Sequence, residues 1–249
     1  MLKIRTEQVN EFERADAPYF ETRLIAHLKE AFPKHCGFLG EAGVAETARY
    51  GIAKAAEYGF TRQAGAKLYA DLLLLVGRGF DTDLQLPWAA EVLNEKTDEA
   101  AKAQRLHAQA TTYLNRVSGP DNEFIDKAQS RIAKEKIDVP SQPGQFGYDT
   151  LERLKEIWPE KYEYLGEDRT KDLVRHCVSA AKTYGMGTER GLLVYTGLAY
   201  MMGAGFDRDP LVKWAGEILN DKQTDGAERA EKLYAEALNY LKQWCAECP

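Results

Sequence analysis

The chain has 249 residues, of which 44% are apolar and 29% are charged. This length and composition are typical of a soluble globular protein with one large domain or two ordinary ones. The formal net charge of −6 and the isoelectric point near 5.4 argue against the basic face that nucleic-acid binding requires, so we expect no nucleic-acid partner.

Nothing in the sequence predicts export or membrane insertion. Residues 1–7 are polar and lack the basic and apolar regions of a secretory signal. The longest apolar run, 191–206, is too short to span a bilayer and is interrupted by glycines. We therefore expect a cytoplasmic protein with reduced cysteines and no membrane contact; the cysteines are Cys36, Cys177, Cys245 and Cys248.

Helical periodicity predicts the elements of the first part of the chain. After a polar lead-in at 1–17, we expect helices at 20–31, 44–57, 61–77, 88–94 and 98–116. Pro33 ends the first helix, and 35–41 is expected to be a loop because Gly37 and Gly40 break helices.

The second part of the chain repeats this order. Helices are expected at 149–157, 171–183, 188–203, 209–220 and 226–244. Between the two parts, 121–136 has the pattern of an extra helix, and the proline- and glycine-containing stretch 140–145 has that of a linker. No stretch shows the alternation of a strand, so we predict an all-α fold.

One motif explains why the order repeats. Residues 77–94 and 203–220 both read G-x-G-F-D-x-D-x4-W-A-x-E-[VI]-L-N, at a separation of 126 positions. Without a gap, residues 32–94 match 158–220 at 21 of 63 positions. The sequence therefore predicts a tandem duplication of a four-to-five-helix bundle, with pseudo-two-fold symmetry. The predicted division is helical repeat 1 at 1–116, a linker with one helix at 117–148, and helical repeat 2 at 149–249.

The acidic residues of the repeated turns are the first candidate site: Asp81, Asp83, Asp207 and Asp209. Paired carboxylates can chelate a hard cation or act as an acid and a base. The neighbouring residues favour a structural role instead. Asp83 and Asp209 stand where a helix N-cap is needed, and Pro210 suits the first position of the following helix.

The other residues of the turn also favour a structural role. Gly79 and Gly205 are expected to adopt the left-handed conformation after a helix, and Phe80 and Phe206 to pack on the core.

One tryptophan follows each turn, Trp88 the first and Trp214 the second. A tryptophan at such a position is either an interface anchor or a core residue, and its presence in both copies favours the core. The matched glutamates are expected to form scaffold ion pairs with the matched arginines; these residues are Glu91, Glu217, Arg49 and Arg175.

No catalytic, metal or cofactor site is predicted. The C-x-x-C pair at Cys245 and Cys248 is only half of a zinc site. The four histidines have no metal-binding spacing, and the sequence contains neither a G-x-S-x-G elbow nor a glycine-rich phosphate loop.

A duplicated helical scaffold without catalytic residues is typical of a protein that binds another macromolecule. The acidic surplus favours a basic or amphipathic partner segment in the groove between the two bundles. Tyr148, Tyr162 and Tyr164 form an aromatic group with no counterpart in the first copy. They either contribute to this binding surface or pack the linker.

The first copy resembles a family of small helical bacterial proteins. The family pattern includes F-x-x-x-[LM]-x-x-H-L, G-I-x-x-A-x-x-Y-G and F-D-x-D-x-x-L-P-W-A. The matching residues are Phe20, Leu24, His27, Leu28, Gly51, Ile52, Ala55, Tyr58, Gly59, Phe80, Asp81, Asp83, Leu86, Pro87, Trp88 and Ala89. The second copy departs from it, with Arg153, Cys177 and Lys213 at pattern positions.

Members of this family are encoded near spike, adaptor and effector genes of type VI secretion systems. The resemblance implies an accessory protein without enzymatic activity, a chaperone, co-adaptor or immunity-type partner of a secreted effector. Two alternatives stay open: a toxic effector or hydrolase that uses the F-D-x-D turns, and a structural homo-oligomer.

Overall fold

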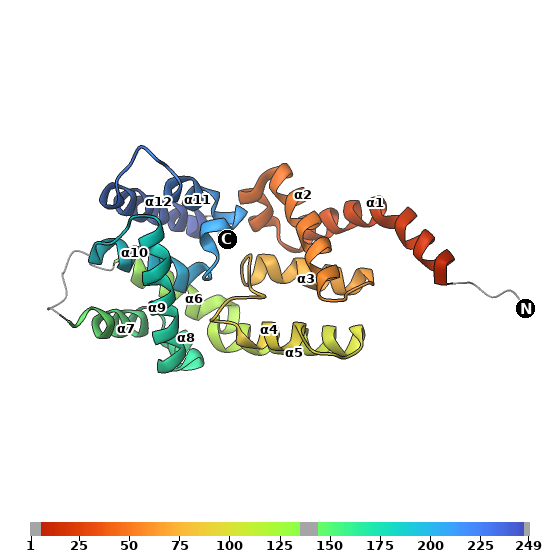
Figure 1. Cartoon of the computed structure of the whole chain (residues 1–249), viewed down its shortest axis with the longest axis horizontal. Helices are drawn as coiled ribbons and strands as arrows, with labels where there is room; N and C mark the ends of the chain where they lie inside the picture. The colour runs from red at the N-terminus through yellow and green to blue at the C-terminus, as the bar shows by residue number, and fades with distance from the viewer. Residues whose placement is uncertain (1–5, 135–143, 247–249) are drawn as a thin grey trace, which may run out of the picture.

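The computed structural model describes the backbone of residues 6–134 and 144–246 and the side chains of 19–134 and 144–244. These residues form helices and no strand, which confirms the predicted all-α fold. Two groups of helices lie side by side along the long axis of the molecule (Figure 1). None of the described helices is long and apolar enough to cross a membrane.

The first half of the chain contains six α-helices within the described residues. They are α1 (Thr6–Ala31), α2 (Pro33–Glu57), α3 (Gln63–Leu75), α4 (Pro87–Leu93), α5 (Glu99–Val117) and α6 (Glu123–Ile132), with the 3-10 helix η1 (Pro120–Asn122) before α6.

The second half contains α7 (Phe146–Ile157), α8 (Pro159–Leu165), α9 (Glu167–Thr183), α10 (Glu189–Met202), α11 (Lys213–Leu219) and α12 (Gly226–Ala246). The short 3-10 helices η2 (Phe206–Arg208) and η3 (Pro210–Val212) lie between α10 and α11. The predicted extra helix is present as α6, the last helix of the first half, and packs against α7, whereas most of the predicted linker falls outside the described residues.

Several helices of the two halves begin 126 positions apart, which is the separation of the two copies of the sequence repeat. Helices α4 and α11 begin and end 126 positions apart, at Pro87–Leu93 and Lys213–Leu219. Helices α3 and α10 begin 126 positions apart, and so do α2 and α8. The repeated sequence therefore produces the same order of helices twice.

The segment predicted as a loop, 35–41, is helical instead. Helix α2 already begins at Pro33, the favoured first position for proline, and only Gly40 leaves the helical conformation, with φ of 64°. The matched Gly166, with φ of 76°, separates α8 from α9. One left-handed glycine per half thus bends the helix without an intervening loop.

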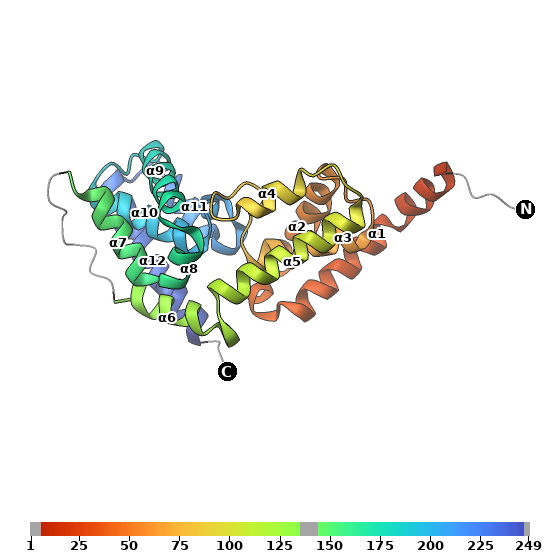
Figure 2. The ribbon, with the colours of Figure 1, turned by 90° about the horizontal axis from the view of Figure 1, so that it is seen from below.

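The predicted polar lead-in is helical as well from Thr6, because α1 begins there. Its N-terminal end projects beyond the body of the molecule in two perpendicular views (Figures 1 and 2). Its C-terminal part anchors it, since Leu24 and Leu28 are buried against α2 and α3.

A buried cation in each half satisfies carbonyl groups at helix ends, which the helix itself leaves unpaired. Lys102 of α5 donates to the carbonyl oxygens of Tyr58 and Leu93 at 2.7 and 2.9 Å. Arg229 of α12 donates to the carbonyls of Tyr184 and Ile218, which end α9 and α11. These two cations fasten α5 and α12 to the helices before them.

The largest group of buried apolar side chains contains residues of both halves. Phe80 and Phe206, the matched phenylalanines of the repeated turns, both belong to it and are each 1% exposed. The predicted core position of both phenylalanines is confirmed. Since the group is continuous, we expect the two halves to unfold together.

We predict that Phe80→Ala and Phe206→Ala each lower the free energy of unfolding by about 3 to 5 kcal/mol, the usual cost of removing a buried phenyl ring. Urea unfolding followed by circular dichroism and by tryptophan fluorescence measures this. Each variant should shift a single transition that both probes share. Tyr148→Ala, at a side chain that is 63% exposed, is the control. Two transitions, only one of which responds to Phe80→Ala, would contradict a shared core.

Candidate functional site: the junction of the two halves

The repeated turns meet where the two halves join. Gly77, Gly79 and Gly203 have φ angles of 95°, 93° and 98°, which glycine adopts without strain. Gly205 does not, with φ of −98°, so the predicted left-handed conformation is confirmed for Gly79 and wrong for Gly205. Glycine is needed at 205 for another reason: a Cβ atom there would lie 2.8 Å from the carbonyl oxygen of Arg78.

Asp83 and Asp209 connect the two halves by reciprocal hydrogen bonds. Asp83 Oδ2 accepts the backbone N–H of Ala204 at 2.8 Å, and Asp209 Oδ2 accepts that of Arg78 at 2.8 Å. Positions 78 and 204 are matched in the repeat. Each half therefore presents a buried carboxylate to the same backbone group of the other half.

The second oxygen of each carboxylate is used within its own turn. Asp209 Oδ1 accepts the N–H of Leu211 at 2.9 Å and caps η3, as predicted, with Pro210 at the first position. Asp83 Oδ1 accepts the N–H of Gln85 at 2.8 Å, but this bond stabilises the turn before α4 and does not cap that helix. Burial raises the pKa of Asp209, and the two N–H donors oppose this shift.

Asp81 and Asp207 hold each turn to its own half. Asp81 accepts the hydroxyl of Tyr58 at 2.8 Å, and Asp207 that of Tyr184 at 2.7 Å. The four candidate carboxylates are thus engaged in bonds that shape the turns and join the halves. Within the described residues, no three His, Cys, Asp or Glu side chains are grouped to hold a metal ion.

The matched tryptophans support the aromatic contacts between the halves. Trp88 lies 6.2 Å from Tyr113, whose ring meets Tyr164 of the other half edge-on at 5.1 Å. Trp214 lies 6.0 Å from Tyr240, whose ring lies 5.1 Å from Phe38 of the other half. Trp88 is buried and Trp214 is half-buried, so the structure places both between helices. Each indole N–H lacks an acceptor among the described residues.

The predicted ion pairs of the matched arginines are wrong. Arg49 lies 3.8 Å from Glu21, and Arg175 lies 2.5 Å from Asp172. Glu217 lies 3.4 Å from Lys213, one turn away on α11. The pairs of Arg175 and Glu217 lie within one helix, whereas that of Arg49 joins α2 to α1; such exposed pairs stabilise the fold little.

The three candidate tyrosines do not form one surface. Tyr164 packs against Tyr113, whereas Tyr162, two positions away on α8, lies under the ammonium group of Lys155 at 5.9 Å. Residues two apart point to different sides of a helix. Tyr148 of α7 stays 63% exposed. Only Tyr164 contributes to the junction.

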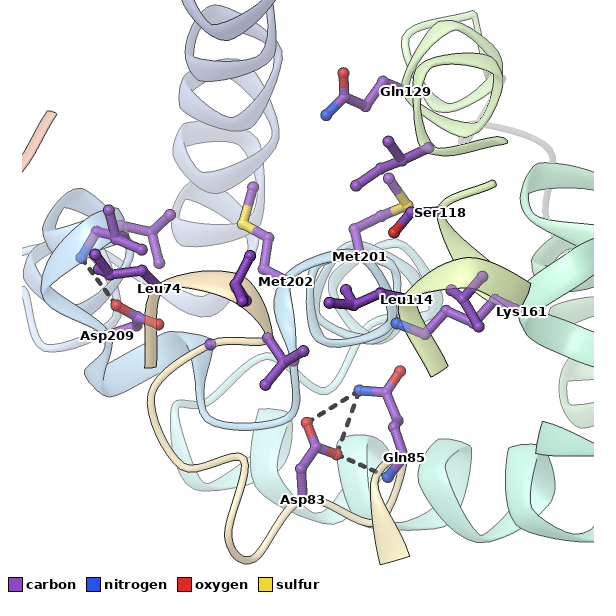
Figure 3. Close-up of a pocket in the computed structure, with 18 of the residues that line it drawn as sticks. Leu74, Asp83, Gln85, Leu114, Ser118, Gln129, Lys161, Met201, Met202 and Asp209 are labelled. Atoms are coloured by element: carbon purple, nitrogen blue, oxygen red, sulfur yellow. Dashed lines mark hydrogen bonds between the residues drawn. The ribbon is translucent and has the colours of Figure 1, made fainter. Parts of the chain in front are cut away.

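A cavity of about 180 Å³ opens at the junction (Figure 3). Its lining includes matched positions of both halves: His35 with Lys161, Asp83 with Asp209, Gln85 with Leu211, Val76 with Met202, and Tyr113 with Tyr240. The walls are largely apolar, and Leu75, which also lines the cavity, is 43% exposed.

Lys161 and Gln85 reach this cavity from different halves (Figure 3). Lys161 is 3% exposed, and its ammonium group donates to the carbonyl oxygen of Tyr200 at 2.5 Å. Burial lowers the pKa of Lys161 to about 8, although Asp83 opposes the shift. Gln85 is 2% exposed; its Nε2 donates to the carbonyl of Ala199 at 2.9 Å, and its Oε1 has no hydrogen-bond partner among the described residues.

Sequence reasoning missed Lys161 and Gln85. The signal that could have found them is their difference from their matched residues, His35 and Leu211. The repeat does not keep the charge at the first of these positions or the polarity at the second, and both positions line the same cavity.

His35 lies at the same junction, 4.9 Å from the ring of Trp244 in α12. Burial, together with the neighbouring charge of Lys34, lowers the pKa of His35 from 6.5 to about 4. His35 is therefore neutral at neutral pH.

The two cysteines whose side chains the structure describes are not reactive groups of the junction. Cys36 and Cys177 are buried free thiols, and burial raises the pKa of Cys177 to about 12. The C-x-x-C pair lies outside the described side chains.

We predict that replacing one reciprocal carboxylate weakens the whole fold. Asp83→Asn and Asp209→Asn each turn an acceptor oxygen into a donor that faces a backbone N–H, so each should cost about 2 to 3 kcal/mol of unfolding free energy. Chemical denaturation measures the change. Asp172→Asn, whose side chain is 60% exposed, is the matched control. If neither junction variant is less stable than this control, the two carboxylates do not hold the halves together.

We also predict a loss of stability in acid that is caused by the protonation of His35 on unfolding. Between pH 6.5 and about 4, the unfolded chain binds a proton at His35 that the folded chain excludes, so stability falls as the pH falls. After allowance for partial exposure, the loss should be about 1 to 2 kcal/mol. Thermal unfolding across this pH range should show a shallower fall for His35→Asn than for the unchanged protein. Equal slopes would refute this.

Comparison of the chain with protein-family models, with curated proteins and with solved structures gave no match. The resemblance stated from the sequence motifs therefore remains a prediction, and the geometry of the junction carries the functional argument.

Proposed function

We propose that the protein is an accessory protein without enzymatic activity, and that it binds a protein partner at the junction of its two halves. The observation that carries this proposal is the cavity that both halves line, with Leu75 exposed at 43% beside half-buried Met202 and Trp244. Partly exposed apolar side chains around a cavity are typical of a site that receives anchor residues of a partner.

The partner segment that fits best is apolar on one side and basic on the other. The chain carries a net charge of −6, so a basic segment gains long-range attraction as it approaches. Its apolar side chains supply the contact at the cavity, where buried apolar area provides the affinity.

We further propose that the two halves are related by a pseudo-two-fold axis through the junction. The support is the reciprocity of the contacts: Asp83 to the N–H of residue 204 and Asp209 to the N–H of residue 78. In a contact with two-fold symmetry, a residue of one half touches a residue of the other half, and the two residues matched to them in the repeat touch each other as well. The recurring helix boundaries support the same relation.

The biological role that we propose follows from the sequence resemblance. The protein acts in the cytoplasm as a chaperone, co-adaptor or immunity-type partner of a type VI secretion effector. The alternative of a hydrolase that uses the F-D-x-D turns gains no support from the geometry, because all four carboxylates accept hydrogen bonds that maintain the fold.

We predict that Leu75→Ser weakens binding of the partner and that Leu84→Ser does not. Both leucines are 43% exposed, but only Leu75 lines the cavity, so the two substitutions cost similar stability and differ in position. The loss of one apolar contact of about 1 kcal/mol corresponds to about fivefold weaker binding.

The measurement is co-purification of the tagged protein from its native host, with mass spectrometry of the bound proteins and their stoichiometry. A stoichiometric effector or adaptor that is retained by Leu84→Ser and depleted by Leu75→Ser supports the proposal. Recovery of no stoichiometric partner, or equal recovery by the two variants, refutes binding at the junction.

A further inference from the structure

We propose that the cavity at the junction is a binding site for a phenol group, supplied by a tyrosine side chain of the protein partner. The source of the phenol rests on the proposed function, whereas the phenol site itself rests only on the cavity and its polar groups.

The size and walls of the cavity fit one aromatic ring. Its volume is about 180 Å³, and an engineered apolar cavity of about 150 Å³ is known to hold benzene. Aromatic side chains of both halves line it, among them Tyr113, Trp158 and Trp244. Rings that surround a cavity offer edges and faces to a further ring, which adds to the gain from buried area.

One polar atom of the cavity needs a donor. Gln85 Oε1 is buried and accepts no hydrogen bond from the part of the chain that the structure describes. Its orientation is set, because the Nε2 atom of the same side chain donates to the carbonyl oxygen of Ala199 at 2.9 Å. An unpaired buried acceptor is costly, so a group that donates to Oε1 gains binding energy.

A second group of the cavity needs an acceptor. The ammonium group of Lys161 has three N–H bonds, and the carbonyl of Tyr200 accepts one of them. The ring of Trp158 lies beside the ammonium group at 4.8 Å. Figure 3 shows Lys161 and Gln85 extending into the same cavity from different elements.

A hydroxyl group satisfies both requirements at once, because it donates one hydrogen bond and accepts others. A carboxylate cannot donate to Gln85, and an ammonium group would be repelled by Lys161. A primary amide has the right polarity, but the aromatic walls favour a ring. Asp83 and Asp209 do not compete for the ligand, since backbone N–H groups already occupy their oxygens.

The experiment compares p-cresol, the side chain of tyrosine, with toluene, the side chain of phenylalanine. Isothermal titration of each into the purified full chain measures affinity, at concentrations that leave the circular-dichroism spectrum unchanged. We expect p-cresol to bind about tenfold more tightly than toluene, the worth of one hydrogen bond to a buried unpaired acceptor. Equal affinities, or no binding of either probe, would overturn the proposal; in the latter case the cavity holds only water.

The variant Gln85→Leu tests the polar end of the site. Leucine already occupies the matched position, Leu211, so the substitution makes the two halves alike and keeps the cavity filled to a similar extent. We expect the preference for p-cresol over toluene to disappear while the affinity for toluene is kept. Leu84→Ser, outside the cavity, should retain the preference. An unchanged preference in Gln85→Leu would remove Gln85 from the site.

The source of the phenol is tested with the co-purified complex. If the partner supplies a tyrosine, its binding blocks p-cresol, and excess p-cresol weakens the complex. A complex that still binds p-cresol overturns the tyrosine source and indicates a free phenolic molecule instead. Failure to recover any partner contradicts the proposed function but not the phenol site, because the preference for p-cresol is measured on the protein without its partner.

Discussion

The reciprocal bonds of Asp83 and Asp209 are the interaction on which the rest of the structure depends. Burial of each carboxylate costs solvation free energy. Two hydrogen bonds from backbone N–H groups, one in its own turn and one in the other half, offset this cost. Because the bonds run in both directions, neither half completes its turn without the other. This arrangement explains how two short helical bundles can share one core.

The same contact determines where the cavity lies. The turns bring the ends of α3 and α10 close together, so that Gly77 and Gly203 each approach the backbone or carboxylate of the other half. Aromatic pairs, Tyr113 with Tyr164 and Phe38 with Tyr240, close the junction on either side. The space that remains between these contacts is the cavity that both halves line.

Residues that are identical or similar in the two copies of the repeat have different roles at this junction from residues that differ between the copies. The matched residues form the turns and the aromatic contacts, and their hydrogen-bonding groups are mostly used for these purposes. The residues that differ supply the polar groups that are available to a ligand in the cavity. Lys161 stands where the first half has His35, and Gln85 stands where the second half has Leu211. The two halves together therefore line one cavity that has a cationic group from the second half and, from the first, an acceptor that no described residue pairs.

The sequence by itself determined the helical class, the repeat and most helix positions, because these depend on local periodicity, capping and glycine placement. It also predicted N-caps at Asp83 and Asp209, of which only the cap by Asp209 is present. The bend of α2 at Gly40 was missed, because a single left-handed glycine does not require a loop. Only the tertiary structure decided which groups meet: the exchange of N–H bonds between the turns, the separation of the three candidate tyrosines, and the approach of Lys161 and Gln85 to one cavity. These are contacts between residues far apart in the chain, and no local pattern encodes the orientation of two packed halves.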